Sequence, residues 1–249
     1  MLRAYRLAAL RGWRIERRTR IWLGRAAPGL LGTAPERVHD EIVRLFGAAD
    51  PLPIAWAAAD GALSSALRLP PGPAVARAAR SLGARRKSDG APAAVAIRLA
   101  LLFHAAATGP DEAADRLDRL KFSRAEARAI TRTLRFLASA FSDAPPLSVL
   151  FAHRAELPLL LRAADAAARG RAQRARVGAL RSAARRVTPG EAPVDGRDLA
   201  RWLDLTPGPE LGRWLDRARF GWFSRQWRDR DQMKRALIAR RFDPAKPVG

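Results

Sequence analysis

The chain contains no cysteine, which excludes disulfide bonds and thiolate metal sites. No apolar run reaches the roughly 20 residues that a membrane-spanning helix needs, because arginines interrupt each of them. The N-terminus is basic but lacks the apolar stretch and small-residue cleavage site of a secretory signal. These absences predict a cytoplasmic protein that does not cross a membrane.

Acidic residues are scarce: 24 Asp and Glu stand against 46 Lys and Arg, a net charge of +22. All the basic residues except Lys87, Lys121, Lys234 and Lys246 are arginine. A GC-rich genome would explain the share of arginine, but it does not explain the excess of base over acid. Such an excess attracts polyanions over long range and gives salt-dependent affinity. We therefore expect RNA as the partner, in preference to a basic surface without one.

Residues that favour strands are also few. Nine valines and seven isoleucines accompany fifty-three alanines, and alanine has the highest helix propensity of all residues. The sequence therefore predicts an all-α protein. Proline- and glycine-containing breaks divide it into the helical regions 1–67, 68–165 and 166–249.

The first region opens on a strongly basic stretch. Residues 1–25 contain eight arginines and a single acid, Glu16, and their apolar residues recur at roughly helical spacing. We interpret them as an arginine-studded helix whose apolar face comprises Leu2, Leu7, Leu10, Trp13, Ile21 and Leu23. No capping residue precedes this helix, so we expect the chain to open in the middle of a longer structure.

Four further helix signals are readable from caps and periodicity. A helix is predicted over 34–46, with Thr33 as its cap and with an apolar face of Val38, Ile42, Leu45 and Phe46. Others are predicted around 95–107, from the capping box at Ser123–Glu126, and around 147–168 with a break near Pro158. Asp195 is expected to cap the helix before it, and Pro207–Pro209 to form a turn before a new helix.

Two segments are candidates for RNA contact because of their charge. Arg85, Arg86 and Lys87 lie in a predicted basic loop between helices. The stretch 169–186 has seven arginines and no acid. Within it, a phosphate-facing row on one helix is predicted for Arg171, Arg174, Arg181 and Arg185. A solvated helix face is the alternative, but the lack of acids favours contact with the RNA backbone, which positions RNA without selecting a sequence.

Motifs in a fixed order carry a family resemblance. LRAYRLAALRGWRIE at 2–16 precedes PERVHDEIVRLF at 35–46. This pair resembles the neck of bacterial CCA-adding enzymes and poly(A) polymerases, where an LRAxRFAAxxGFxIE stretch leads to an ERIxxELxKLL helix. AIRLALLFH at 96–104 and LDRLKFSRA at 117–125 resemble the body motifs of that family, and PVDGRDLARWLDLTPGPELGRWL at 193–215 resembles its tail motif. The resemblance covers most of residues 1–240.

The resemblance implies an elongated multi-helix array of neck (1–67), body (68–165) and tail (166–249). It places five residues beside the nucleotide pocket and the head–neck junction, as braces without a chemical role: Arg3, Arg6, Glu36, Arg37 and Glu41. Because the family tail is associated with the tRNA elbow, it also adds Arg197, Arg201 and Arg213 to the RNA-binding candidates. The Glu-Asp-x-x-Arg motif of the family would fall just before Met1. We therefore expect the catalytic head, with its Mg²⁺, CTP and ATP, on another chain or upstream of an internal start.

Catalytic motifs are poorly represented. Nucleotidyl transfer needs paired carboxylates that hold two metal ions, on a strand after a small-residue turn. Asp229-Arg230-Asp231 has neither feature before it. His39 and His104 are expected to be structural, since metal-dependent phosphohydrolysis needs several converging histidines and the chain has three. We predict no catalytic residue, metal or cofactor on this chain.

Tryptophans in the last region are divided between two interpretations. Trp202 and Trp214 are predicted to lie in the core, whereas Trp222, Phe223 and Trp227 could stack on exposed bases.

The sequence thus predicts the tRNA-binding helical portion of a CCA-adding enzyme (tRNA nucleotidyltransferase) or poly(A) polymerase. It would position the RNA 3′ end while a separate nucleotidyltransferase head adds nucleotides, and it would be inactive without that head. One alternative is a non-enzymatic RNA- or ribosome-associated protein derived from the same scaffold. Another is a basic helical adaptor for acidic proteins.

Overall fold

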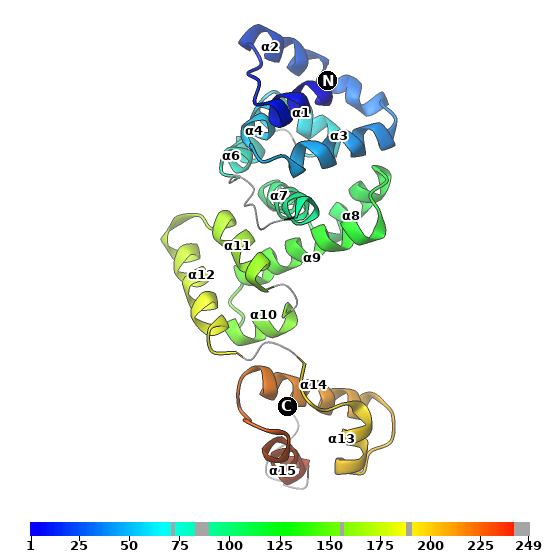
Figure 1. The fold of residues 1–249 in the computed structure, drawn as a ribbon, viewed down its shortest axis with the longest axis vertical. Coiled ribbons are helices and arrows are strands. Elements are labelled where there is room, and N and C mark those ends of the chain that lie inside the picture. Colours follow the sequence, from blue (N-terminus) through cyan, green and yellow to red (C-terminus); the bar gives the residue numbers. More distant parts are fainter. Residues whose placement is uncertain (71–72, 83–89, 155–156, 188–190, 242–249) are drawn as a thin grey trace. The chain divides into compact units, whose positions relative to one another are not determined.

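The computed structural model describes residues 1–70, 73–82, 90–154, 157–187 and 191–241. These residues form fifteen α-helices and one 3-10 helix and contain no strand, which confirms the all-α prediction (Figure 1). The chain divides into two compact units. Unit 1 comprises Met1–Asp143 and Pro158–Val177, and unit 2 comprises Ala144–Leu157 and Gly178–Gly249. Within the described ranges, no helix has both the length and the apolarity to span a membrane.

The elements occur along the chain in the following order. The first are α1 (Leu2–Arg11), α2 (Arg17–Ala26), the 3-10 helix η1 (Ala27–Gly32), α3 (Pro35–Gly47), α4 (Leu52–Ala59), α5 (Ala62–Leu67) and α6 (Pro73–Arg80). They are followed by α7 (Ala91–Ala105), α8 (Pro110–Arg119), α9 (Arg124–Ala140), α10 (Pro146–Ala152), α11 (Leu157–Ala167) and α12 (Gly170–Ala184). The last are α13 (Gly196–Leu203), α14 (Pro209–Phe223) and α15 (Arg230–Arg241).

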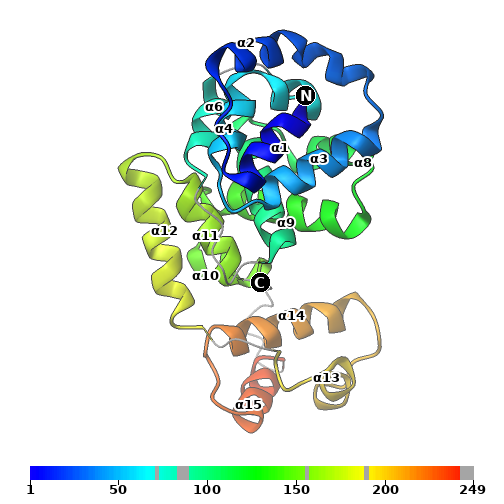
Figure 2. The ribbon, with the colours of Figure 1, turned by 45° about the horizontal axis from the view of Figure 1, so that its top comes forward.

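The prediction of a single basic helix over 1–25 is wrong. Gly12 adopts a left-handed φ of 69° and its N–H bonds to Ala8 O, so α1 ends there and a new helix begins at Arg17. The predicted apolar face is wrong as well. α1 buries Leu2 together with Tyr5, Arg6, Ala8 and Ala9, whereas Leu10, Trp13 and Ile21 are about half exposed, at 54%, 60% and 47%. Figure 2 shows α1 against α3 and α4, with which it packs.

The second predicted helix is confirmed. α3 buries Val38, Ile42, Leu45 and Phe46 on one face, as the periodicity predicts. Its predicted cap is wrong, because α3 begins after Ala34, which makes no side-chain cap hydrogen bond. Thr33 instead ends η1, and its hydroxyl donates to Gly29 O at 3.4 Å.

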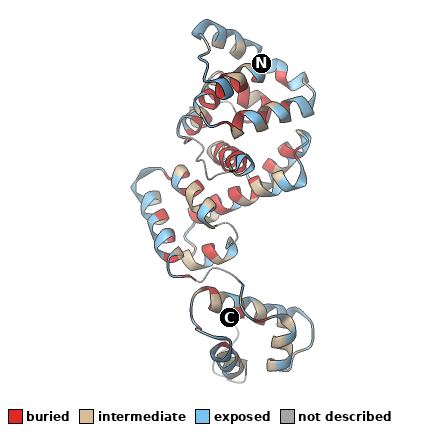
Figure 3. Cartoon of the chain, viewed as in Figure 1, coloured by how far each residue is buried: buried red, intermediate tan, exposed pale blue. Residues whose placement is uncertain are grey.

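α7 is the central helix of unit 1 and packs on α3, α6 and α9. It is buried along most of its length, from Ala94 to Phe103 (Figure 3). The buried run includes Arg98, which is only 4% exposed. Its Nη1 donates to Phe46 O at 2.8 Å and to Ala48 O at 2.6 Å, where the carbonyls at the end of α3 have no helical partner. Arg98 therefore serves as the C-terminal cap of α3.

α2 buries no residue, and polar contacts hold it to the rest of unit 1. The Arg20 guanidinium forms a bidentate ion pair with the Asp60 carboxylate, in which Nε donates to Oδ2 at 2.8 Å and Nη2 donates to Oδ1 at 2.7 Å. The Tyr5 hydroxyl donates to the same Oδ2 at 2.9 Å. Burial of Tyr5, together with its bond to Asp60, raises the pKa of the phenol. Asp60 thus ties α1 and α2 to the end of α4.

The capping box at α9 is confirmed, since Glu126 N donates to Ser123 Oγ at 3.3 Å and Ser123 N donates to Glu126 Oε2 at 2.8 Å. The break predicted near Pro158 is confirmed by the end of α10 at Ala152 and the start of α11 at Leu157. Helices from both sides of residue 67 pack together within unit 1, as α4 does on α6. The division into neck, body and tail stays a prediction.

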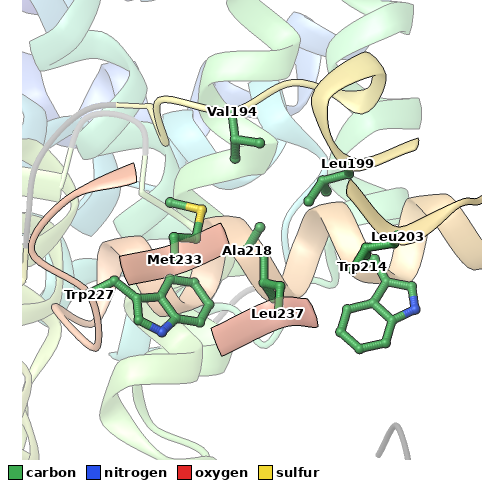
Figure 4. Packing of buried hydrophobic residues seen from close by; sticks show 8 residues of the cluster. All are labelled: Val194, Leu199, Leu203, Trp214, Ala218, Trp227, Met233 and Leu237. Atoms are coloured by element: carbon green, nitrogen blue, oxygen red, sulfur yellow. The ribbon is translucent and has the colours of Figure 1, made fainter. Parts of the chain in front are cut away.

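Unit 2 has its own apolar core, formed by α13, α14, α15 and their connections (Figure 4). Its buried members are Val194, Leu199, Leu203, Trp214, Ala218, Trp227, Met233 and Leu237. The Trp227 ring lies directly on Gly221 of α14. A Cβ placed at Gly221 would stand 2.3 Å from Trp227 Cζ3, well inside van der Waals contact. This glycine is therefore required by the close approach of the indole.

Candidate nucleic-acid interface

α12 has an apolar face and an arginine face. Val177, Leu180 and Ala183 are buried, and Arg176 is half-buried with its Nε donating to Ala140 O at 3.1 Å. At the start of the helix, Gln173 Oε1 accepts from Arg169 N at 2.5 Å, which satisfies one of the N–H groups that a helix start leaves open.

The predicted row of arginines is exposed on the other face of α12. Arg171, Arg174 and Arg181 lie within the helix and Arg185 directly follows it. Steps of three, seven and four residues bring all four to one side at 3.6 residues per turn. No acidic residue occurs from 169 to 186. Because planar guanidinium groups can donate paired hydrogen bonds to phosphate oxygens, an exposed row of them on one side of a helix can bind phosphate groups.

Arg85, Arg86 and Lys87, the other charge-based candidates, lie outside the described residues. Their assignment stays a prediction.

Arg197, Arg201 and Arg213 are exposed in unit 2. Arg197 and Arg201 are four residues apart on α13 and share a face, while Arg213 lies on α14. The expectation that Asp195 caps the helix before it is wrong. Asp195 Oδ1 accepts from Asp198 N at 2.9 Å, so it caps α13, the helix that follows. The hydrogen bond from the Asp198 N–H is the main cause that lowers the pKa of Asp195.

The turn predicted at Pro207–Pro209 is confirmed, since α14 begins at Pro209 after Gly208.

The aromatic residues of unit 2 differ in how far they are buried, and this difference tests their predicted roles. Trp214 is fully buried, as predicted, and Trp202 is half-buried against the same core. Phe223 and Trp227 are 2% and 7% exposed, so the suggestion that they stack on exposed bases is wrong. Trp222 is half-buried against the core. Cations of α15 cover Trp202, with Arg230 Cζ at 5.3 Å and Lys234 Nζ at 5.7 Å from the ring centre.

The five candidates for the head–neck junction differ in burial and in their contacts. Arg6 is 8% exposed, and its Nε lies 2.9 Å from Glu41 Oε2, which joins α1 to α3. Arg3, Glu36 and Arg37 are exposed. An internal ion pair accounts for Arg6 and Glu41, and a role of all five beside a nucleotide pocket stays a prediction.

The histidines and the Asp-x-Asp segment have structural contacts. His39 lies edge-on to Phe122, with ring centres 4.5 Å apart, and its Nε2 is 3.5 Å from Glu126 Oε2. Asp229 Oδ1 accepts from Gln232 N at 2.7 Å at the start of α15. Among the described residues, no group of three or more His, Cys, Asp or Glu is placed to hold a metal ion.

The structure brings together a second group of basic residues that the sequence analysis did not identify. Arg77, His104 and Arg169 line one pocket in unit 1. Burial, and then the neighbouring Arg169, lower the pKa of His104. No motif could have revealed this site, because its residues come from helices far apart in the sequence.

No protein-family model matches this chain, and a search of curated proteins also finds no significant match.

Proposed function

We propose that this chain is the RNA-binding helical portion of a CCA-adding enzyme or poly(A) polymerase. The observation that carries the proposal is the row of exposed arginines formed by Arg171, Arg174 and Arg181 of α12 and by Arg185 directly after it. The ordered motifs that resemble the neck, body and tail of that family supply the choice of tRNA.

The geometry of the row suits an RNA backbone. From Arg171 to Arg185 the helix rises by about 21 Å at 1.5 Å per residue, which is long enough to follow several phosphates. Each planar guanidinium can donate two parallel hydrogen bonds to one phosphate. Contacts of this kind fix the position and orientation of the RNA, and the 3′ end would be presented to a catalytic head that carries the metal ions and the nucleotide.

RNA binding is tested with a variant in which Arg171, Arg174, Arg181 and Arg185 are all replaced by glutamine. Affinity for tRNA is measured by fluorescence anisotropy at several salt concentrations. We expect tRNA affinity to fall by about 10- to 100-fold at low salt, and the slope of log K against log salt to shrink by about 3 to 4. The reason is that each lost phosphate contact removes about one released counterion.

A matched variant removes the same charge elsewhere, by replacing Arg44, Arg119, Arg124 and Arg128, which are also exposed, with glutamine. It should retain most of the affinity. Equal losses in both variants would mean that net charge alone attracts the RNA and would refute the α12 interface. Wild-type binding to tRNA that is no tighter than binding to polyglutamate would refute the tRNA proposal itself.

Purification from the native host separates the two RNA-binding functions. A nucleotidyltransferase head that accompanies the chain supports the proposal. Ribosomal or other RNA without such a head would instead support the non-enzymatic RNA-associated protein.

A further inference from the structure

A concave site in unit 1 is lined by residues of α6, α7, α11 and the start of α12. Figure 1 labels these four helices. Its volume is about 280 Å³. Since a water molecule occupies about 30 Å³ of liquid, the cavity has room for a phosphate group and part of the molecule that carries it.

One wall of the cavity is a fixed arginine. Arg169 Nη2 donates to Ser81 Oγ at 2.9 Å, at the end of α6, and Nη1 donates to Ala166 O at 3.0 Å, in α11. Arg169 lies between α11 and α12 and its guanidinium is thus held by two other elements. A guanidinium held in this way loses little conformational freedom when it binds a ligand.

Further polar groups line the site, and none of them carries a negative charge. Arg77 of α6 lines the cavity and is exposed. The imidazole of His104 and the amide of Gln173 also line it. No acidic side chain occurs among the described residues of the cavity wall. Two guanidinium groups and an imidazole therefore line a space whose described walls carry no compensating negative charge.

We propose that this cavity binds a phosphate group, with Arg77 and Arg169 as its cationic ligands. Two guanidinium groups can each donate to phosphate oxygens, and an N–H group of His104 can add a hydrogen bond. The Ser81 hydroxyl donates to Ala78 O and accepts from Arg169, so it positions Arg169 and does not itself bind the phosphate. The site is separate from the arginine row on the outer face of α12. Its existence does not depend on the proposed function.

The three histidines of the chain, His39, His104 and His153, allow a direct test by NMR. Inorganic phosphate is titrated into the full chain at constant ionic strength, and the ring C–H signals of the histidines are followed. We expect a saturable shift of the His104 signal alone, together with a rise in its pKa, since a bound dianion stabilises the imidazolium. No shift of His104, or equal shifts of all three histidines, would overturn the proposal.

Variants of α6 provide the specificity control. Arg77→Gln should weaken the phosphate response of His104 by at least about tenfold, because it removes one charge-assisted contact. Arg80→Gln removes an exposed arginine of the same helix that does not line the cavity, and it should leave the response unchanged. The same response in both variants would contradict the assignment. Arg77→Lys, which keeps the charge, should retain much of the binding if Arg77→Gln is poorly folded.

Competition identifies the source of the phosphate. Displacement of inorganic phosphate by a 5′-phosphorylated oligonucleotide, but not by its 5′-hydroxyl form, assigns the site to a terminal phosphate. Equal displacement by both forms assigns it to the RNA backbone. If neither displaces it, the ligand is a small phosphorylated molecule or free phosphate. Because His104 is read without RNA in the first experiment, failure of this site and failure of the α12 interface are distinguishable.

Discussion

Replacing Arg98 with methionine is expected to destabilise unit 1 by about 3–5 kcal/mol. Methionine keeps the apolar stem but leaves Phe46 O and Ala48 O without their donors, which now lie 2.8 and 2.6 Å away. Hydrogen bonds to a charged group contribute about 1.5–3 kcal/mol each, and a buried carbonyl left unpaired costs its desolvation in addition. Urea denaturation followed by far-UV circular dichroism measures the loss.

Two further variants serve as comparisons for Arg98→Met. Arg98→Lys keeps a cation in the site but not the planar guanidinium, so its loss of stability should be smaller than that of Arg98→Met. Arg128→Met makes the same change at an exposed position of α9 and should alter stability by no more than about 0.5 kcal/mol. If Arg98→Met were as stable as Arg128→Met, the end of α3 would not need its cap.

Gly221→Ala is the substitution with the next largest expected effect. Alanine normally stabilises a helix interior relative to glycine by about 1 kcal/mol. Here the added methyl would meet Trp227 Cζ3 and Cη2 at 2.3 and 2.4 Å. The indole is 7% exposed and forms part of the unit 2 core, so it can move only by opening that core. We expect a net loss of about 1–3 kcal/mol, the usual cost of overpacking.

The same helix carries the control. A Cβ added at Gly212 would have no neighbouring atom within 4 Å, so Gly212→Ala should raise stability by about 0.5–1 kcal/mol. The two substitutions are therefore predicted to act with opposite sign. Stabilisation of unit 2 by both, measured from tryptophan fluorescence in urea, would show that Trp227 does not press on Gly221.

Local sequence rules predict the elements whose stabilising groups are neighbours in the chain. The apolar face of α3 and the Ser123–Glu126 capping box each occupy only a few residues, so periodicity and spacing are sufficient. They fail for the basic segment 1–25 because a single left-handed glycine, Gly12, ends α1 while the helical spacing of apolar residues continues past it. The rules do apply to Asp195, where our prediction is wrong: Asp favours the start of a helix, and Asp195 and Asp198 have the spacing of a capping box for the helix that follows.

The candidate sites divide in the same way. The arginine row on α12 is predictable because one helix carries all of it, and the period alone places its members on one side. The buried role of Arg98 and the cavity of Arg77, His104 and Arg169 are not predictable, since each depends on partners far away in the sequence. Only tertiary packing determines that Arg98 is buried and that Arg77 and Arg169 line one cavity.

The attachment of α2 through Asp60 has a consequence for local opening of unit 1. A helix that buries a hydrophobic face separates only at the free-energy cost of exposing that face to water. α2 buries no residue, and the bidentate ion pair between Arg20 and Asp60 joins it to the end of α4. Its detachment is opposed by this partly buried ion pair, which salt screens less than an exposed one, and by the Arg20 guanidinium lying over the Trp56 ring. We therefore expect residues 17–26 to open at a lower free-energy cost than the helices around α7, because their separation exposes no buried apolar face.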